Sequence, residues 1–298
     1  MRGGSHLNSD LHWRQEQLAA CLGGDPGAAL ELASKLDPKF PEDWRAVAAQ
    51  LATQLPGKCP GSSIVGIGGG QGAGKSTLAR ALVAALGLVG VRAAAVSLDD
   101  FYLTRAQRRS LGEQVHPLLA TRGVPGTHDL ALLRKTIANI GDKRVTLPRF
   151  DKAADDRLAP DQWPVLAGPL ELLIFEGWCI GATPQPKALL RTPVNELEAQ
   201  EDPDGDYRTY VNQALASDYV PLWQSLFAWL YLALPDMAAV RDWRWQQEQQ
   251  LHPAQRMSAA ALERFIAHYQ RLTQWQFEQA PQLASWTLGL DADHRLML

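Results

Sequence analysis

The chain has 298 residues, a length that suits one α/β domain with an appendage or two domains. Its composition, 46% hydrophobic and 20% charged, excludes wholesale disorder and a collagen-like repeat. The formal net charge is −3 and no run of basic residues occurs, so we expect no nucleic-acid partner. Three cysteines without a C-x-x-C pair indicate a reducing compartment.

Apolar stretches in this chain are short. The N-terminal part has no continuous apolar segment, so we expect no signal peptide. Residues 226–234 form one of the longest apolar runs, well below the roughly 20 residues of a membrane-spanning helix. We therefore expect a cytoplasmic protein without a membrane partner. The sequence leaves the oligomeric state open.

Residues 1–55 are predicted to form a helical cap. Leu18, Leu22 and Trp44 belong to apolar positions that recur at roughly helical spacing. Gly-Gly-Asp-Pro at 23–26 and Asp-Pro at 37–38 mark breaks between short helices. The segment carries no chemical motif, so we assign catalysis to a second domain over residues 56–298.

From residue 64 onward the pattern alternates between strands and helices. Apolar runs predict buried strands at 64–67, 93–98, 170–175 and 226–234. Helices are expected at 78–86, 130–140 and 258–279, while proline-rich residues 182–206 indicate a long loop or insertion. This alternation predicts a three-layer α/β fold with a mostly parallel sheet.

A phosphate-binding loop follows the first predicted strand. Residues 69–76 match G-x-x-x-x-G-K-[ST] in full, so the fold is predicted to be a P-loop NTPase that binds ATP. The backbone N–H groups and the start of the next helix would hold the phosphates. The expected nucleotide ligands are Gly69, Gly70, Gln71, Gly72, Ala73, Gly74, Lys75, Ser76 and Thr77.

Two acidic positions follow predicted strands. Glu176 ends the strand at 170–175, where it would hold Mg²⁺ together with Ser76, or simply end a strand at the surface. Asp99 and Asp100 follow the strand at 93–98. They suit a base that accepts a hydroxyl proton, or an Asx turn that caps the next helix.

Residues 97–102, S-L-D-D-F-Y, resemble the D-x-F-Y signature of the phosphoribulokinase, uridine kinase and pantothenate kinase group. The resemblance implies that Asp99 is the general base of a kinase. It also implies that Asp100, at the variable position, and Tyr102 lie near the substrate.

Further segments resemble the D-glycerate 3-kinase family. Residues 122–129 are similar to R-G-x-P-G-[TS]-H-D, residues 147–152 to P-x-[FY]-D-K, and residues 243–248 to W-R-x-x-Q-E near a lid. Residues 155–157 partly match G-D-R, after Ala153-Ala154 where the family has a serine and a longer stretch. The resemblance runs from about residue 64 to the C-terminal helix.

This resemblance implies Mg-ATP-dependent phosphorylation of D-glycerate to 3-phosphoglycerate. The carboxylate of glycerate would be held by arginine and lysine side chains in two loops, unless these residues are ordinary surface charges. The candidate ligands are Arg122, Arg149, Lys152 and Arg157. His128 would bond a substrate hydroxyl or cap the following helix, and Arg244, rather than Arg241, would act on the phosphates with Lys75.

Two alternatives stay open at the level of sequence. The acceptor of the same reaction would be pantothenate, a nucleoside or a sugar phosphate. In a different class, nucleotide hydrolysis would drive a conformational switch or an assembly step, which requires a water-positioning residue and a partner surface. The R-G-V-P-G-T-H-D segment favours glycerate by analogy.

Overall fold

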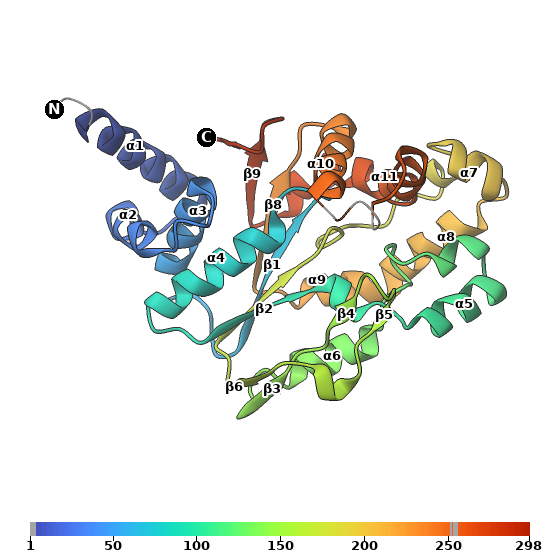
Figure 1. The fold of residues 1–298 in the computed structure, drawn as a ribbon, viewed down its shortest axis with the longest axis horizontal. Helices are drawn as coiled ribbons and strands as arrows, with labels where there is room; N and C mark the ends of the chain where they lie inside the picture. The colour runs from blue at the N-terminus through green and yellow to red at the C-terminus, as the bar shows by residue number, and fades with distance from the viewer. Residues whose placement is uncertain (1–3, 251, 253–255) are drawn as a thin grey trace.

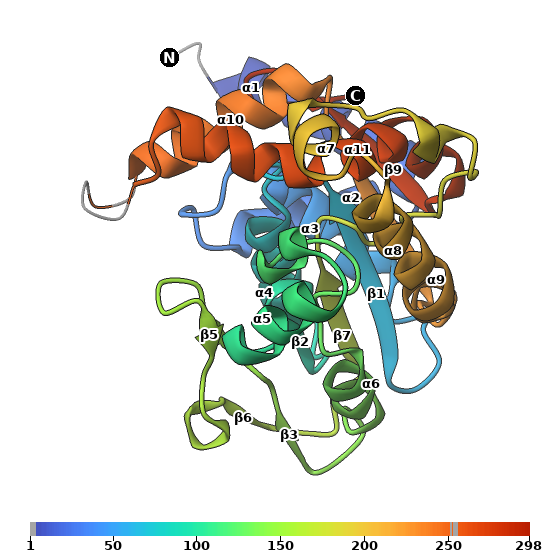
Figure 2. The same cartoon turned by 90° about the vertical axis from the view of Figure 1, so that its right-hand side faces the viewer.

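The fold was obtained as a computed structural model that describes residues 4–250, 252 and 256–298 (Figures 1 and 2). The main sheet contains β1 (Ser63–Gly69), β2 (Ala93–Ser97), β7 (Leu172–Glu176), β8 (Ala228–Ala233), β9 (Trp286–Leu290) and β10 (Leu296–Met297). Two small hairpins pair β3 (Arg144–Thr146) with β6 (Val165–Ala167), and β4 (Phe150–Asp151) with β5 (Asp156–Arg157).

The α-helices precede, connect and follow these strands. They are α1 (Gly4–Leu22), α2 (Pro26–Lys35), α3 (Glu42–Gln54), α4 (Lys75–Leu88), α5 (Arg105–Gln114), α6 (Leu130–Ala138), α7 (Glu196–Glu201), α8 (Asp206–Ala214), α9 (Val220–Gln224), α10 (Met237–Gln250) and α11 (Ala259–Leu283). Short 3₁₀ turns occupy Leu98–Phe101, Pro117–Ala120, Pro160–Gln162 and Leu189–Arg191, and a π turn, Leu215–Tyr219, joins α8 to α9.

The sheet is mostly parallel, as predicted. Its strand order is β10-β9-β8-β1-β7-β2, and β10 alone of these six runs antiparallel to its neighbour. Glu176 of β7 lies opposite both Ile67 of β1 and Ser97 of β2. The carboxyl ends of three adjacent strands therefore coincide, at the edge where open α/β sheets bind ligands.

Successive side chains of the central strands pack into two hydrophobic layers, one on each face of the sheet. In β7, Ile174 packs into the layer that contains α4, whereas Leu173 and Phe175 pack into the layer that contains α6. Figure 1 shows α4 on one side of the sheet and α6 and α9 on the other. Burial on both faces explains why the central strands appear as continuous apolar runs in the sequence.

The N-terminal segment is helical with breaks at the predicted turns. Asp25 caps α2, since its side chain accepts hydrogen bonds from the N–H groups of Gly27 and Ala28. Helix α3 packs along α4 (Figure 1), and Leu51 and Leu82 belong to one core. Residues 1–3 of the predicted cap lie outside the described residues. The domain boundary at residue 55 stays a prediction.

Several elements escaped the sequence analysis. The segment 182–206 is mostly irregular, as expected, but it contains α7. Strands β9 and β10, helices α5 and α8, and both small hairpins were not predicted. The β3–β6 hairpin lies beside α6, and β5 lies beside α5 in both views (Figures 1 and 2). Within the described ranges, the helices are too short or too polar to cross a membrane.

Candidate active site

The phosphate loop has the predicted strand–loop–helix setting. Strand β1 ends at Gly69 and α4 begins at Lys75, so the helix N-terminus faces the loop. Gly72 has a φ of +85°, and a Cβ atom there would lie 2.6 Å from Cβ of Trp243. A larger residue would therefore be both strained and obstructed, which explains the glycine.

The phosphate loop is supported by distant parts of the chain. Trp44 of α3 packs against Gly74, and Trp243 of α10 packs against Gly72. The His294 ring stacks on Trp243 at 3.8 Å, and its Nε2 lies 3.2 Å from the Gly72 carbonyl oxygen. These contacts carry no local sequence signal, because they join different elements of the chain, and the longest, between His294 and Gly72, spans 222 residues.

Lys75, Ser76 and Glu176 meet beside the loop. The buried Lys75 ammonium donates to the Gly70 carbonyl at 2.8 Å, and the Ser76 hydroxyl donates to Oε1 of Glu176 at 2.7 Å. Burial lowers the pKa of Lys75, although the carboxylates of Glu176 and Asp99 oppose that effect. Burial raises the pKa of Glu176, against the opposing charge of Lys75.

The predicted metal ligands therefore lie together. A hydroxyl and a carboxylate are the oxygen donors that Mg²⁺ prefers, and kinases complete the ion's coordination with waters and nucleotide phosphates. In the described part of the chain, no three His, Cys, Asp or Glu side chains cluster as a metal site. Ser76 and Glu176 thus fit an ion that arrives with ATP rather than one held by protein alone.

Asp99 lies at the carboxyl end of β2 and has two partners. Its Oδ1 accepts from the Tyr102 hydroxyl at 2.9 Å, and its Oδ2 from the Lys152 ammonium at 2.6 Å. Burial alone would raise the pKa of Asp99. The charge and hydrogen bond of Lys152, with the hydroxyl of Tyr102, outweigh burial and lower the pKa to about 2. Asp99 is therefore ionised at neutral pH.

Asp100 has different partners from Asp99 and contacts the backbone. It accepts hydrogen bonds from the N–H groups of Ser97 and Phe150, and it pairs with Arg149 at 3.0 Å. Asp100 thus closes a capping box on its own 3₁₀ turn, whereas the next helix, α5, is capped by Thr104, so the alternative that this acidic pair caps the next helix was wrong. Substrate binding by Asp100 and Arg149 stays a prediction.

All four cationic residues that are candidates for binding the substrate carboxylate form ion pairs with acidic side chains. The pairs are Arg122–Asp155, Arg149–Asp100, Lys152–Asp99 and Arg157–Asp129. Of the four cations, Lys152 has the most exposed side chain, at 61%. They surround the end of β2, but an incoming anion would have to compete with an existing partner.

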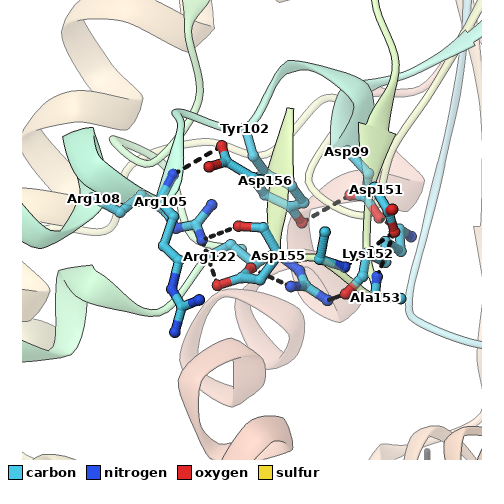
Figure 3. A network of polar contacts seen from close by, with 12 residues as sticks. Asp99, Tyr102, Arg105, Arg108, Arg122, Asp151, Lys152, Ala153, Asp155 and Asp156 are labelled. Carbon is cyan, nitrogen blue, oxygen red and sulfur yellow. Dashed lines mark hydrogen bonds and ion pairs between the residues drawn. The ribbon is translucent and has the colours of Figure 1, made fainter. Parts of the chain in front are cut away.

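Asp155 anchors the β4–β5 hairpin (Figure 3). Its carboxylate pairs with Arg122 and, at 2.6 Å, with the fully buried Arg108 of α5. Asp156 accepts a hydrogen bond from the N–H of Arg105 at the start of α5. Asp155 has a φ of +55°, a left-handed conformation that aspartate tolerates.

His128 is buried beside the candidate base. Its Nδ1 lies 2.7 Å from the Tyr219 hydroxyl, and its ring stacks on Tyr102 with centroids 4.6 Å apart. Its Nε2 has no hydrogen-bond partner among the residues that the structure describes. Burial lowers the pKa of His128 to about 3, so the ring is neutral. Asp129, not His128, caps α6, through the N–H of Leu132.

Sequence analysis also missed an aromatic support under the R-G-V-P-G segment. The Tyr269 hydroxyl of α11 donates to the Arg122 carbonyl at 3.1 Å, and the Trp178 indole donates to the Gly123 carbonyl at 3.0 Å. The two rings pack edge to face. Such contacts hold the segment in place, and only the fold brings them together.

Arg244 lies on α10, as predicted. It pairs with Glu248 at 2.8 Å and its guanidinium lies 5.4 Å from the centre of the Phe265 ring. Arg241 pairs with Glu263 at 3.2 Å. Action of Arg244 on transferring phosphate stays a prediction.

Comparison with known proteins agrees with this geometry. The profile of the Phosphoribulokinase / Uridine kinase family matches residues 64–181. A Schizosaccharomyces pombe protein named uncharacterized kinase mug58 is 35% identical over 219 residues, which cover 69% of this chain and 78% of the relative. The chain belongs to this family of P-loop kinases.

Two further relatives of this kinase carry a substrate in their names. The chloroplastic D-glycerate 3-kinase of Arabidopsis thaliana is 31% identical over 196 residues, which cover 62% of this chain but only 41% of the plant protein. A solved D-glycerate 3-kinase from Cryptococcus neoformans var. grubii superposes with a TM-score of 0.67 and 26% identity, covering 96% of this chain and 98% of that one.

Proposed function

We propose that this kinase transfers the γ-phosphoryl group of ATP to a hydroxyl of D-glycerate and forms 3-phosphoglycerate. The observation that carries the proposal is the set of charged residues around Asp99. This ionised carboxylate lies at the end of β2, close enough to Lys75 of the phosphate loop to affect its pKa. Lys152 contacts the same carboxylate and Arg122 contacts the Lys152 carbonyl, so cations that could hold a small hydroxy acid lie beside the base. The names of two relatives support glycerate.

The chemistry balances with the groups present. The acceptor oxygen forms a bond to the γ-phosphorus, the bond from that phosphorus to the β,γ-bridging oxygen breaks, and ADP leaves. The hydroxyl proton passes to Asp99. Lys75 lies where it can neutralise the charge that develops on the phosphates. Mg²⁺, held by Ser76 and Glu176, supplies further charge neutralisation when bound.

His128 and Tyr102 complete the proposed acceptor site. The buried Nε2 of His128, which has no partner among the described residues, is suited to a hydroxyl of the substrate, since a neutral imidazole can accept or donate one hydrogen bond. Arg122, Arg149 and Arg157 are proposed carboxylate ligands that would exchange partners on binding. Arg244 is proposed to reach the phosphates from α10. A cytoplasmic location and the lack of a nucleic-acid partner stay predictions.

The test is ADP release with Mg-ATP, with and without D-glycerate, by wild type and Asp99→Asn. We expect a glycerate-dependent rate that falls roughly 10²–10⁴-fold in the variant, the usual contribution of a general base. Asp161→Asn, at an exposed 3₁₀ turn, is the matched control. Stimulation by pantothenate, a nucleoside or a sugar phosphate instead of glycerate would contradict the acceptor. Acceptor-independent hydrolysis alone would favour a nucleotide-dependent switch.

A further inference from the structure

The partner of the candidate base is a lysine that can move. Lys152 lies in the turn between β4 and β5, and its ammonium is 2.6 Å from Oδ2 of Asp99. The Lys152 side chain is 61% exposed, whereas that of Asp99 is 26% exposed. A long exposed side chain changes rotamer within nanoseconds, so this ion pair can open without a change of fold.

The backbone that carries Lys152 is fixed. The side chain of Asp151 accepts hydrogen bonds from the N–H groups of Ala153 and Ala154, which closes the turn. The Lys152 carbonyl accepts a hydrogen bond from Arg122 at 3.3 Å (Figure 3), and Asp155 ties the hairpin to α5. These contacts hold the turn, so the Lys152 side chain can change rotamer without a change in its backbone.

The ion pair opposes the chemistry assigned to Asp99. A carboxylate oxygen that faces an ammonium is a weak proton acceptor, and Lys152 lies where an acceptor hydroxyl would approach Oδ2. The buried Lys75 lies near Asp99 as well, but its ammonium already donates to Gly70. Of these two lysines, Lys152 is the one that can leave.

We propose that Lys152 acts as a charge gate, which rests on the function proposed above. In the free enzyme Lys152 pairs with Asp99. When an anionic hydroxy acid binds, the ammonium passes to the substrate carboxylate and frees Oδ2 for the hydroxyl proton. A neutral acceptor cannot draw the lysine away, so the gate selects anionic acceptors and leaves the base paired in their absence. Lys152 is thus a positioning residue for Asp99 and a specificity determinant.

Other ionisable groups near Asp99 bear on its titration. They are Lys75 on α4, Asp100 and Tyr102 after β2, His128 before α6, Lys152 in the hairpin, Glu176 and Cys179 at the end of β7, and Tyr269 on α11. Burial lowers the pKa of His128 and raises that of Cys179. The protonation of His128 and Cys179 is therefore unchanged across neutral pH. Among the neighbouring charges, that of Lys152 does most to lower the pKa of Asp99.

The experiment compares wild type, Lys152→Met and Lys152→Arg. The values of kcat and KM are measured from pH 3 to 9 with D-glycerate and with its neutral amide. For Lys152→Met we expect kcat/KM for glycerate to fall about 10- to 150-fold, as for the loss of one hydrogen bond to a charged group. The preference for glycerate over the amide should shrink by a similar factor.

The pH profile separates a gate from a structural lysine. Without the ammonium, the acid limb of kcat/KM should move up by about 1 to 3 pH units, since an adjacent cation lowers a carboxyl pKa by that amount. Lys152→Arg retains the charge and should retain the limb. Lys143→Met, at an exposed position before β3, is the control that should match wild type.

The outcomes are distinct. If the wild type phosphorylates glycerate but Lys152→Met keeps both the acid limb and the acceptor preference, the gate is wrong and the proposed function stands. If the wild type does not phosphorylate glycerate, the proposed function fails, and the gate fails with it because its acceptor is wrong.

Discussion

The contact between Gly123 and Tyr269 allows a direct test of how α11 supports the segment at residues 122–126. Gly123 has a φ of +140°, and a Cβ atom there would lie 2.0 Å from the Tyr269 hydroxyl oxygen and 2.4 Å from Cζ. Real Cβ contacts are essentially never below 3.0 Å, so in Gly123→Ala the ring must retreat by about 1 Å. That movement would break the hydrogen bond from Tyr269 to the Arg122 carbonyl.

The expected cost has two parts. Overpacking costs about 1–3 kcal/mol. The unfavourable φ adds about 1–3 kcal/mol. Gly123→Ala should therefore lower the free energy of unfolding by about 2–6 kcal/mol, measured by urea denaturation. The KM for the acceptor should rise, because Arg122 shifts with its carbonyl.

Two variants make this prediction refutable. Gly87→Ala, within α4 and with no atom near the added methyl, should be neutral or stabilise by up to about 1 kcal/mol. In a Tyr269→Ala background the cost of Gly123→Ala should shrink to the backbone part, about 1–3 kcal/mol. An equal cost in both backgrounds would show that the two residues do not clash and would refute the reasoning.

Three further predictions concern the hairpin anchor, the buried histidine and the metal ligand. Asp155→Asn removes the carboxylate that pairs with the fully buried Arg108. Because Asp155 itself is 36% exposed, we expect a moderate loss of about 1–3 kcal/mol in the free energy of unfolding, measured in urea. A loss below about 0.5 kcal/mol would contradict the role of Asp155 as an anchor. His128 titrates near pH 3 when folded but near 6.5 when unfolded, so between these values only the unfolded chain binds the proton and stability falls as the pH drops. At pH 5 this costs about 2 kcal/mol relative to pH 7.5, and the loss of stability between these pH values should be smaller by that amount in His128→Gln, while His268, whose pKa burial lowers to about 4, contributes equally to both proteins. Ser76→Ala should raise the Mg²⁺ concentration for half-maximal ADP release at least about 10-fold, whereas Ser76→Thr, which keeps the hydroxyl, should not.

Much of the nucleotide half of the site was predictable because its signals are local. The glycines and Lys75 of the phosphate loop follow directly on β1, and Glu176 directly ends β7. A parallel sheet brings such strand ends together without further information. The helices of the N-terminal segment were likewise predictable, from apolar spacing and from the breaks at glycine and proline.

For the proposed acceptor site, the sequence indicated which residues belong to it but not how they are arranged. The pairing of Lys152 with Asp99 joins positions 53 residues apart, and the support of Arg122 by Tyr269 joins positions 147 apart. Neither contact leaves a periodic trace in the sequence. Strand β9 was missed for a different reason, since W-T-L-G-L is short and contains a glycine.

The place of β1 at the centre of the sheet has a consequence for biosynthesis. Both of its neighbours come much later in the chain: β7 begins at residue 172 and β8 at residue 228, whereas β1 ends at residue 69. At roughly 5–20 residues per second, a ribosome needs about 8–32 s to make the intervening segment before β8. During that interval an apolar strand and its glycine loop remain without their full set of partners. Nascent chains of this kinase should therefore depend on chaperones that bind extended apolar segments, and slowing translation ahead of β8 should increase their aggregation.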